Sequence, residues 1–285
     1  MIINLNLQNN KDITVKDFLV SGESFTLKYD AEKQMLITTP QPSAASLPSY
    51  YESEDYISHT DDANGVLAFL YQRVKTYSLK RKVRLISKLN KGEGSLLDIG
   101  AGTGDFLNVA KENHWTVSGV EVNEQARVLA QNKGISLKED MDLLGDTKYD
   151  VITLWHVLEH IPNIEETCQK LEFHLKENGH LVIAVPNYKS YDAHYYKEFW
   201  AAYDVPRHLW HFSQASMKKL FSSKMNLIKT RPLVFDSYYV SLLSEKYRTS
   251  KKLSLKALWV GFKSNRKAKQ TSEYSSLIYC FKKGF

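Results

Sequence analysis

The sequence contains little cysteine and no long apolar run. Its 285 residues include only two cysteines, Cys168 and Cys280, which lie far apart in the chain. This spacing argues against a disulfide framework and against a zinc site built from thiolates. Apolar runs such as Val66 to Tyr71 are much shorter than the ~18 to 20 residues of a membrane-spanning helix. Because Met1 to Lys11 contain neither a basic leader nor an apolar run, we expect no signal peptide and a cytoplasmic setting.

Acidic residues are almost absent from the C-terminal segment. The whole chain has a formal charge of +6, with 38 basic and 32 acidic residues. From Lys246 to the end there are 11 basic residues and one acid, Glu273, so this segment carries +10 and the remainder carries −4. The basic excess is therefore local, and the net charge alone does not indicate a nucleic-acid partner.

Composition and turn residues suggest three successive parts. Residues 24 to 39 alternate apolar and polar side chains around a polar centre, which predicts a hairpin, and prolines 40, 42 and 48 then interrupt any regular element. A helical pattern begins at Asp61 or Asp62 and ends at Asn90, where Gly92 follows. We expect a hairpin and aromatic lid over 1–60, a core over 61–245, and a basic helical insertion with a final edge strand over 246–285.

Strand and helix patterns alternate through the core, which is typical of an α/β protein with a parallel sheet covered on both faces. We expect helices after Gly104, Asn123 and Ile164, and another from Ser213 to about Ser223. The expected strands are Ser95 to Ile99, Thr116 to Glu121, a weaker Ile135 to Leu137, Tyr149 to Leu154, His180 to Val185, Leu227 to Phe235 and Tyr274 to Phe281. The prediction is a doubly wound, mostly parallel, seven-stranded sheet.

A glycine-rich turn is the most informative motif. The strand Leu96 to Ile99 leads into glycine at positions 100, 102 and 104, after which a helix is expected. Such a turn lets a ligand lie against bare backbone at a helix N-terminus. Glu121, at the end of the next strand, is suited to accept hydrogen bonds from both hydroxyls of a ribose. Turn and acid together indicate a nucleoside-containing cofactor.

The spacing of the turn argues against a dinucleotide. A dinucleotide fingerprint requires a third glycine where this chain has Asp105, and a carboxylate there would repel a pyrophosphate. A sulfonium with an amino-acid end would instead be compatible with Asp98 and Asp105. A ligand without phosphates is expected.

These motifs resemble those of the class I S-adenosylmethionine-dependent methyltransferases, in particular the ubiquinone-pathway O-methyltransferase type. The similarity covers about residues 60 to 240 and includes the glycine turn, Glu121 and the run Tyr149 to Ile161. It implies a Rossmann-like methyltransferase fold with S-adenosyl-L-methionine as cofactor. The cofactor-binding residues that it implies, together with one from the aromatic segment, are Asp98, Gly100, Gly102, Gly104, Glu121, Asp142, Trp155 and Tyr51.

A group of histidines and an acid follows the expected strand Tyr149 to Leu154. His156, Glu159 and His160 are spaced i, i+3 and i+4 and would share one face if helical. Imidazole beside carboxylate is suited to removing a proton from an acceptor hydroxyl or amine. Metal binding by this group with a later histidine, and helix capping with packing, are the alternatives; no metal is part of our prediction, because a hard cation prefers oxygen ligands.

A second candidate region is the loop after Val185. Loops at the carboxyl ends of strands receive substrate in these folds, and a Pro-Arg-His segment resembles the same methyltransferase type. We favour function for Arg207 and His208, and core packing for the aromatics Trp200, Trp210 and Phe212. The predicted catalytic residues are therefore His156, Glu159, His160 and His208.

Two terminal features have competing interpretations. Tyr50, Tyr51, Tyr56 and His59 could close over a sulfonium through cation–π attraction or could dock an N-terminal arm. The basic segment Lys251 to Lys269 is most simply interpreted as the solvated face of a helix. The less favoured interpretation is that it binds a phosphorylated, lipid-linked or nucleic-acid substrate.

The function predicted from the sequence is methyl transfer to an oxygen or nitrogen of a small-molecule or lipid-linked acceptor. The alternatives are a nicotinamide-dependent oxidoreductase, which Asp105 opposes, and a non-catalytic module that binds nucleic acid through its basic C-terminus.

Overall fold

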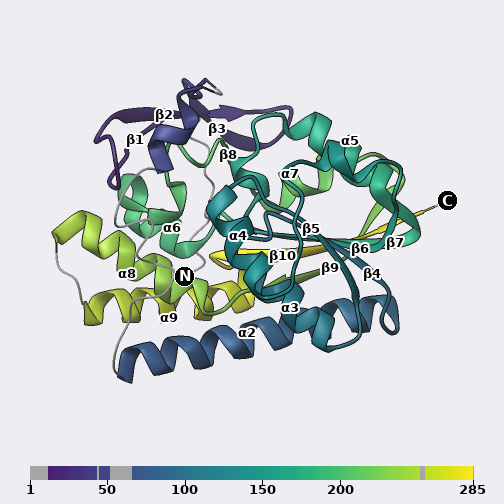
Figure 1. Ribbon diagram of the computed structural model, residues 1–285. Helices are drawn as coiled ribbons and strands as arrows, with labels where there is room; N and C mark the ends of the chain where they lie inside the picture. The colour runs from purple at the N-terminus through teal and green to yellow at the C-terminus, as the bar shows by residue number, and fades with distance from the viewer. Residues whose placement is uncertain (1–11, 44, 52–65, 251–253, 285) are drawn as a thin grey trace. The chain divides into compact units, whose positions relative to one another are not determined.

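The computed structural model describes residues 12–43, 45–51, 66–250 and 254–284 (Figure 1). Its contacts divide the chain into two compact units. Unit 1 contains residues 1–57, 186–219 and 232–276, and unit 2 contains residues 58–185, 220–231 and 277–285. The units interleave along the chain, whereas the predicted parts 1–60, 61–245 and 246–285 follow one another in order.

A mixed sheet forms the centre of unit 2. Its order is β5-β4-β6-β7-β10-β9, and β4 runs parallel to β5 and β6, as does β6 to β7. Residues such as Leu96, Leu97, Val151 and Ile152 are fully buried, because both faces of this sheet are covered. The strands are β4 (Ser95–Ile99), β5 (Thr116–Val120), β6 (Tyr149–Trp155), β7 (Leu175–Pro186), β9 (Met225–Pro232) and β10 (Ser276–Lys283).

The sheet has six strands among the described residues, so the prediction of seven is wrong in number although the α/β class is confirmed. The weak strand expected at Ile135 to Leu137 is reduced to one parallel bridge between Val120 and Lys138. Lys138 exchanges both backbone hydrogen bonds with the β5 edge, from its N–H to Gly119 O and from Glu121 N–H to its own carbonyl. The acids at 139 and 140 then turn the chain into a 3₁₀ turn, which leaves no length for a strand.

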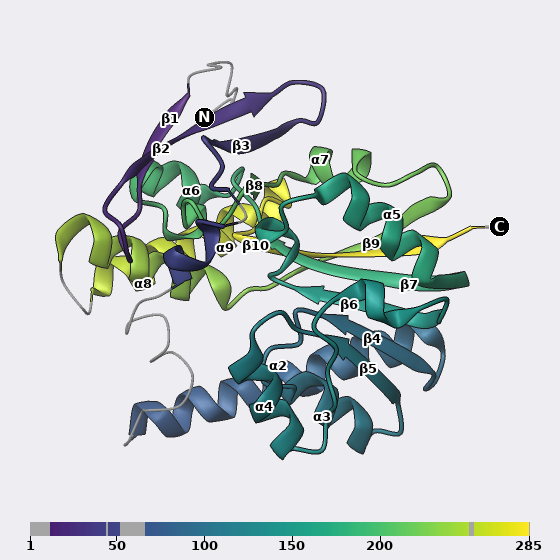
Figure 2. The same cartoon turned by 45° about the horizontal axis from the view of Figure 1, so that its top comes forward.

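Helices lie on both faces of this sheet. Helices α2 (Val66–Asn90) and α3 (Asp105–Glu112) pack against each other on one face, and α5 (Ile164–His174) lies on the opposite face (Figure 2). Helix α4 (Glu124–Asn132) begins after Asn123, whose side chain accepts a hydrogen bond from Ala126 N–H at 2.9 Å. The expected helices after Gly104, Asn123 and Ile164 and the helix end at Asn90 are confirmed; Asp61 and Asp62 lie outside the described residues.

Unit 1 contains a second, antiparallel sheet. The predicted hairpin is confirmed as β2 (Ser24–Asp30) and β3 (Met35–Thr39), paired antiparallel. The sheet is extended by β1 (Ile13–Lys16) on one side and by the two-residue strand β8 (Trp210–His211) on the other, in the order β1-β2-β3-β8. Strand β1 alternates apolar Ile13 and Val15 with polar Thr14 and Lys16 over only four residues, and β8 is too short to show alternation, so neither strand was predicted.

Helices from three parts of the sequence complete unit 1. They are α6 (Tyr191–Tyr196), α7 (Gln214–Lys219), α8 (Asp236–Thr249) and α9 (Leu255–Thr271), with short 3₁₀ turns that include η1 (Leu47–Tyr51). The expected helical insertion before the last strand is thus the pair α8 and α9. The expectation that the last strand lies at the sheet edge is wrong, because β10 pairs between β7 and β9 and β9 forms the edge. Asp192 is fully buried and accepts hydrogen bonds from Trp200 Nε1, Ser264 Oγ and Ser275 Oγ at 2.6 to 2.8 Å.

The aromatics of the loop after β7 are mainly structural. Trp200 and Phe212 are 2% and 1% exposed, which confirms their expected core role, whereas Trp210 is only partly buried, with the Lys33 ammonium 5.8 Å from the centre of its ring.

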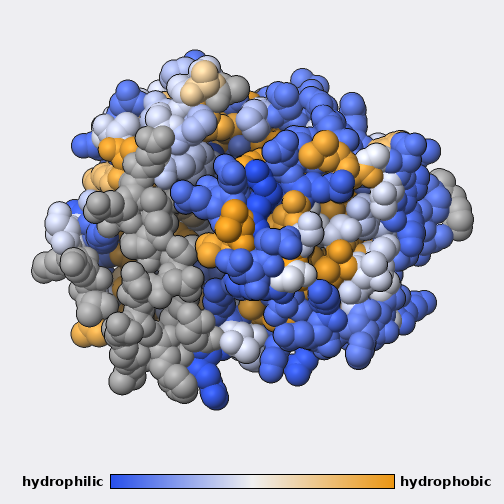
Figure 3. Space-filling view, in the orientation of Figure 1, coloured by the Kyte–Doolittle hydropathy of each residue, from blue (hydrophilic) through white to orange (hydrophobic). Residues whose placement is uncertain are grey.

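The face drawn in Figure 3 is mostly hydrophilic, and its apolar residues occur in separate small groups, as is usual for protein surfaces. Within the described part of the chain, no helix is both long and apolar enough to cross a bilayer.

Candidate functional site

The glycine turn, residues 100–104, follows β4 and exposes bare backbone to open space at one position. Gly100, Gly102 and Gly104 all have positive φ, of 67°, 53° and 75°. A Cβ atom at Gly100 would collide with the side chain of Val157, whereas one at Gly102 would meet no atom within 4 Å. Gly100 is therefore required by packing, while Gly102 presents bare backbone beside open space at the N-terminus of α3.

Glu121 is fixed against this turn. Its Oε2 accepts a hydrogen bond from Gly102 N–H at 2.8 Å, and its Oε1 accepts one from Asn123 N–H at 2.9 Å. The carboxylate keeps further lone pairs on both oxygens, since each oxygen can accept more than one hydrogen bond. The spacing of 21 residues from Gly100 thus corresponds to direct contact between the acid and the turn.

Asp98 lies inside the sheet, just before the turn. Its side chain is 3% exposed, and Thr153 Oγ1 donates a hydrogen bond to its Oδ1 at 2.5 Å. Burial raises its pKa to about 7, and the nearby negative charge of Glu121 adds to this rise, while the Thr153 hydrogen bond and the Lys82 ammonium oppose it. Asp98 is therefore divided between its protonated and ionised forms near neutral pH.

Asp105 has a different environment from the one expected. Lys75 and Lys133 bind its two carboxylate oxygens at 2.7 and 2.6 Å. Burial raises the pKa of Asp105, but these two lysines outweigh burial and hold the pKa below its usual value. The expectation of two acids available to a cationic cofactor is wrong for Asp105, because its charge is already balanced by two lysines.

Trp155 ends β6 and is enclosed by an aromatic ring and a cation. Its ring meets Phe106 edge-on at 5.6 Å, and the Lys82 ammonium lies 4.3 Å from its centre. The buried indole Nε1 has no hydrogen-bond partner among the described residues. A buried donor without a partner is costly, so a ligand acceptor at this position would relieve that cost.

His156 and Glu159 come together, although not through a helix. The expectation of one helical face is wrong, because His156 has φ of +58° and only Leu158 to His160 form a 3₁₀ turn. The backbone N–H of His156 still donates a hydrogen bond to Ala184 O of β7 at 2.9 Å, so the residue follows the pairing of β6 with β7.

This turn nevertheless places the imidazole of His156 close to the carboxylate of Glu159. His156 Nδ1 lies 3.4 Å from Glu159 Oε1; the His156 side chain is 38% exposed and that of Glu159 is 1% exposed. His160 follows directly, with its N–H bonded to Val157 O at 3.0 Å. A solvent-accessible imidazole backed by a buried carboxylate is suited to general-base chemistry.

Asp142 lies on the 3₁₀ turn η2 (Met141–Leu144) and is bound to a lysine. Its Oδ1 pairs with Lys170 Nζ at 2.6 Å, and its side chain is 70% exposed. The neighbouring Leu143 is 52% exposed. The expected adenine contact of this pair remains a prediction.

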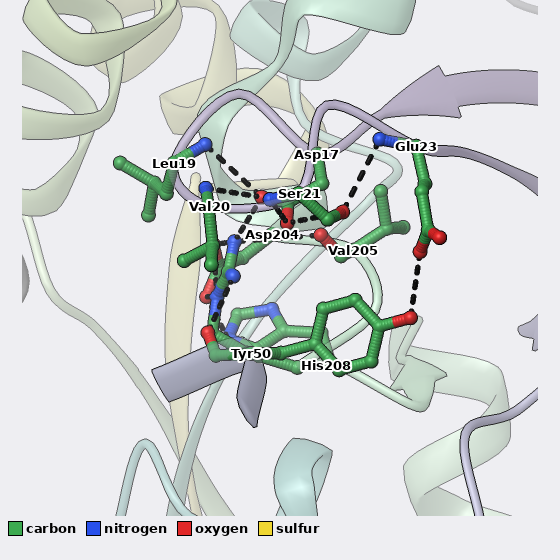
Figure 4. Close-up of polar contacts among 10 residues, drawn as sticks. Asp17, Leu19, Val20, Ser21, Glu23, Tyr50, Asp204, Val205 and His208 are labelled. Carbon is green, nitrogen blue, oxygen red and sulfur yellow. Dashed lines mark hydrogen bonds and ion pairs between the residues drawn. The ribbon is translucent and has the colours of Figure 1, made fainter. Parts of the chain in front are cut away.

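His208 and Arg207 belong to unit 1 and are held by its own residues. His208 Nδ1 lies 2.9 Å from Ala202 O, and Nε2 lies 3.9 Å from Asp204 Oδ2. The Arg207 guanidinium is 1% exposed and donates to Asp17, Asp204 and the carbonyl of Tyr50 at 2.8 to 2.9 Å. Figure 4 shows this cluster, in which Asp17 also accepts hydrogen bonds from the backbone of Leu19, Val20 and Ser21.

The buried cluster changes the interpretation of Arg207. A guanidinium held by two carboxylates and a carbonyl joins the β1–β2 loop, the η1 turn and the Asp204 loop within unit 1. These contacts give Arg207 a structural role in unit 1, and the functional role that the sequence favoured for it stays a prediction.

The aromatic segment before the core is only partly described. The Tyr50 hydroxyl donates a hydrogen bond to Glu23 Oε2 at 2.6 Å, and Tyr51 ends η1 and is partly buried. Tyr56 and His59 lie outside the described residues, so the lid stays a prediction.

Lys75 and Lys82 were not expected at this site. They lie seven residues apart on α2, which places them on one helix face, and that spacing is the signal that could have indicated them. Arg127 is another unexpected contributor, since its Nη1 donates to the carbonyls of Glu121 and Val122 at 2.9 and 2.8 Å.

Comparison with known sequences agrees with this geometry. A family described as "Methyltransferase domain" matches residues 71–227. The chain belongs to this family, and its fold and motifs are those of the class I S-adenosylmethionine-dependent methyltransferases.

Two curated relatives carry the name "Ubiquinone biosynthesis O-methyltransferase". The protein of Rickettsia prowazekii is 30% identical over 117 residues, which are 38% of this chain and 44% of the relative. That of Rickettsia conorii is 28% identical over 112 residues, 36% of each chain. The alignments thus span less than half of each relative's length.

Solved structures share the fold at low identity. The plantazolicin methyltransferase BpumL, solved with SAH, is 18% identical with a TM-score of 0.52 over 85% of this chain and 95% of that one. The [4+2]-cyclase SpnF is 15% identical with a TM-score of 0.50 over 72% and 80%. Proteins named for different reactions thus share this fold, so the reaction must be argued from the site.

Proposed function

We propose that the chain is a methyltransferase that uses S-adenosyl-L-methionine and transfers a methyl group to an oxygen or nitrogen of a small-molecule acceptor. The observation that carries the proposal is the pair formed by Gly102 and Glu121. Open backbone and an anchored carboxylate stand side by side at the carboxyl ends of β4 and β5, which is where ligands bind in open α/β sheets.

The residues around the turn fit such a cofactor. The proposed role of Glu121 is to accept hydrogen bonds from the ribose hydroxyls, and that of the 100–104 turn is to line the methionine part. Trp155 offers the unpartnered Nε1 donor and an aromatic face. Asp98 would bind a cationic amine in its ionised form, which the amine would favour by lowering the pKa of Asp98 from about 7.

The cofactor, when bound, supplies an electrophilic methyl group on a sulfonium. The protein's contribution is to hold the acceptor atom in line with that methyl group and to remove the acceptor's proton. We assign proton removal to His156 or His160. Glu159, 3.4 Å from His156 Nδ1, would orient that ring and stabilise it once protonated.

An oxygen acceptor is the favoured choice. The curated relatives are named as O-methyltransferases, and a hydroxyl acceptor needs a base near neutral pH, which the His156, Glu159 and His160 group would provide. His208 stays among the proposed catalytic residues; its ring is held within unit 1, with Nδ1 2.9 Å from Ala202 O and Nε2 3.9 Å from Asp204 Oδ2.

Calorimetry with the intact chain tests the cofactor first. S-adenosylmethionine and S-adenosylhomocysteine should bind, while NAD should not. Tight binding of NAD with no heat from either sulfur compound would overturn the proposal in favour of an oxidoreductase.

The base is tested by a methylation assay on a panel of phenols and amines. Once an acceptor is found, His156→Ala and His160→Ala should be compared with His114→Ala, a histidine in the turn that follows α3. Loss of about 100-fold in kcat in one of the first two, with unchanged cofactor binding, would identify the base. Equal activity in all three variants would exclude both histidines.

A further inference from the structure

Helix α9 packs its small residues inward and leaves its large apolar residues outward. Its buried positions are Ala257, Val260, Gly261, Ser264 and Ala268. Its exposed large side chains are Leu255, Leu258, Trp259 and Phe262, with 86%, 44%, 51% and 55% of their surface accessible. Ordinary amphipathic helices of soluble proteins have the opposite distribution, with their large apolar residues in the core.

The exposed residues form a single stripe. Positions 255, 258, 259 and 262 are spaced i, i+3, i+4 and i+7, so they lie along one face of the helix. The buried face is held by a close contact, because a Cβ at Gly261 would approach the backbone of Tyr238 on α8 to 2.9 Å. The stripe therefore cannot turn inward without losing that close packing.

The surroundings of the stripe are basic. Helix α9 has five basic residues and no acid, and Arg266 and Lys269 continue the exposed face toward its C-terminus. Lys263 Nζ lies 4.4 Å from the centre of the Trp259 ring, and Lys267 Nζ lies 4.4 Å from that of Tyr191 on α6. Aromatic rings flanked by lysines that extend along them are typical of side chains at a membrane surface.

We propose that the outer face of α9, formed by Leu255, Leu258, Trp259, Phe262, Arg266 and Lys269, binds the surface of an anionic lipid bilayer. The four apolar side chains enter the boundary between headgroups and acyl chains, and the basic residues contact the lipid phosphates. The binding is peripheral, and it brings the enzyme to the surface where a lipophilic acceptor would be dissolved.

The charge and the side-chain types favour a bilayer over other occupants. A second copy of the chain joined through this face would bring two sets of five cations together, which is repulsive. A nucleic acid would use the cations and the Trp259 ring but would leave Leu255 and Leu258 against phosphate and water. An anionic bilayer satisfies both the apolar stripe and the charge.

Flotation with lipid vesicles tests the proposal on the intact chain without any need for methyl transfer. Vesicles of phosphatidylcholine alone are compared with vesicles that also contain phosphatidylglycerol, at low and at high salt. The chain should float with the anionic vesicles only, and less of it at high salt. A W259S/F262S variant should bind about tenfold or more weakly, because it loses the inserted aromatic area.

Matched variants separate insertion from general effects. F173S removes an aromatic residue of similar exposure, 48%, on α5 in the other unit, and it should bind as the unsubstituted chain does. R266Q/K269Q should weaken binding about tenfold or more, and K28Q/K229Q, which removes two exposed lysines elsewhere, should weaken it much less. Circular dichroism and the thermal midpoint verify folding of each variant.

Three results would overturn the proposal. One is equal flotation with neutral and anionic vesicles, or none with either. Another is full binding by W259S/F262S. The third is a dimer in size-exclusion chromatography that this variant converts to a monomer, which would assign the face to a second copy of the chain. None of these results bears on cofactor binding, so methyl transfer is tested separately.

Discussion

Glu121 shows how a single carboxylate can link two elements. It receives backbone hydrogen bonds from Gly102 and Asn123, so it ties the glycine turn to the start of α4. The same carboxylate oxygens are those that we propose to accept hydrogen bonds from the ribose hydroxyls. The residue therefore combines a local structural role with the proposed cofactor contact.

Substitution of Glu121 should weaken cofactor binding. Glu121→Ala removes charge-assisted hydrogen bonds worth about 1.5 to 3 kcal/mol, so the Kd for S-adenosylhomocysteine in calorimetry should rise about 10- to 100-fold. Glu121→Gln, which keeps an acceptor for Gly102 N–H, should cost less. Glu124→Ala, a neighbouring exposed acid on α4, is the control. An unchanged Kd in Glu121→Ala would remove this residue from the site.

Asp98 predicts a pH dependence of stability. Its folded pKa of about 7 exceeds the ordinary value of 3.8, so the folded state binds the proton more tightly than the unfolded state does. The stability from this group is present at low pH and is lost as pH rises through about 4 to 7.

The variant Asp98→Asn should remove this dependence, since its amide stays neutral and its oxygen can still accept from Thr153. Its free energy of unfolding relative to the unsubstituted chain should rise by up to ~4 kcal/mol between about pH 4 and pH 8. This difference in the free energy of unfolding is measured by urea unfolding at several pH values without cofactor. A difference that stays constant with pH would contradict the assigned pKa.

At the scale of elements, the turns after the strands determine which candidate site residues come together. The β6 strand ends at Trp155, and the positive φ of His156 redirects the chain before Leu158 to His160 form a 3₁₀ turn. Spacing alone suggested a helix here, yet His156 N–H still bonds Ala184 O of β7, so the backbone at His156 belongs to the end of the β6–β7 pair and not to a helix. The residues still meet, because the turn is tight enough to bring Glu159 back toward His156.

The Arg207 cluster should control the stability of unit 1. Arg207→Met leaves the buried Asp17 without its cation and should lower the free energy of unfolding by about 3 to 5 kcal/mol. Lys170→Met breaks an ion pair with the exposed Asp142 and should cost about 0 to 1 kcal/mol. The free energies of unfolding of the two variants are measured by urea unfolding monitored by far-UV circular dichroism.

A second substitution tests whether the loss of stability comes from the unpaired charge of Asp17. Adding Asp17→Asn to Arg207→Met removes the unpaired charge and should recover part of the loss. If Arg207→Met were no more damaging than Lys170→Met, the cluster would not be a stabilising link.

At the scale of the whole molecule, charge and apolar surface are distributed unevenly. The +10 of the C-terminal segment includes the five cations of α9, and the same helix exposes four large apolar side chains. The other 245 residues carry −4. A charge count for the entire chain hides this division, which is the basis of the proposed bilayer contact.

The two cysteines should report on unfolding of the molecule. Burial, the largest cause, raises the pKa of Cys168 to about 12 and that of Cys280 to about 11, and their side chains are 4% and 0% exposed. Both thiols should therefore react with a thiol reagent only after denaturation, because a buried, protonated thiol is a poor nucleophile. Ser136→Cys, at an exposed position, should add one fast-reacting thiol. Fast reaction of two thiols in the native chain would contradict this burial.

The α/β class, the parallel core strands, three helix starts and the pairing of glycine turn with acid could all be predicted from the sequence. These features depend on local signals: apolar runs for strands, Asn123 as a helix cap, and glycine where φ is positive. Local propensity and hydrophobic period are properties of neighbouring residues, so the sequence alone contains them.

Long-range contacts decided the rest. Only the tertiary structure paired Asp105 with Lys75 and Lys133, buried Arg207 between acids 17 and 204, and reduced the seventh strand to one bridge at Lys138. The same holds for α9, whose composition predicts an amphipathic helix without saying which face packs. The close fit of Gly261 against α8 selected the small-residue face for the interior, because contact across residues distant in the chain sets which side of a helix is buried.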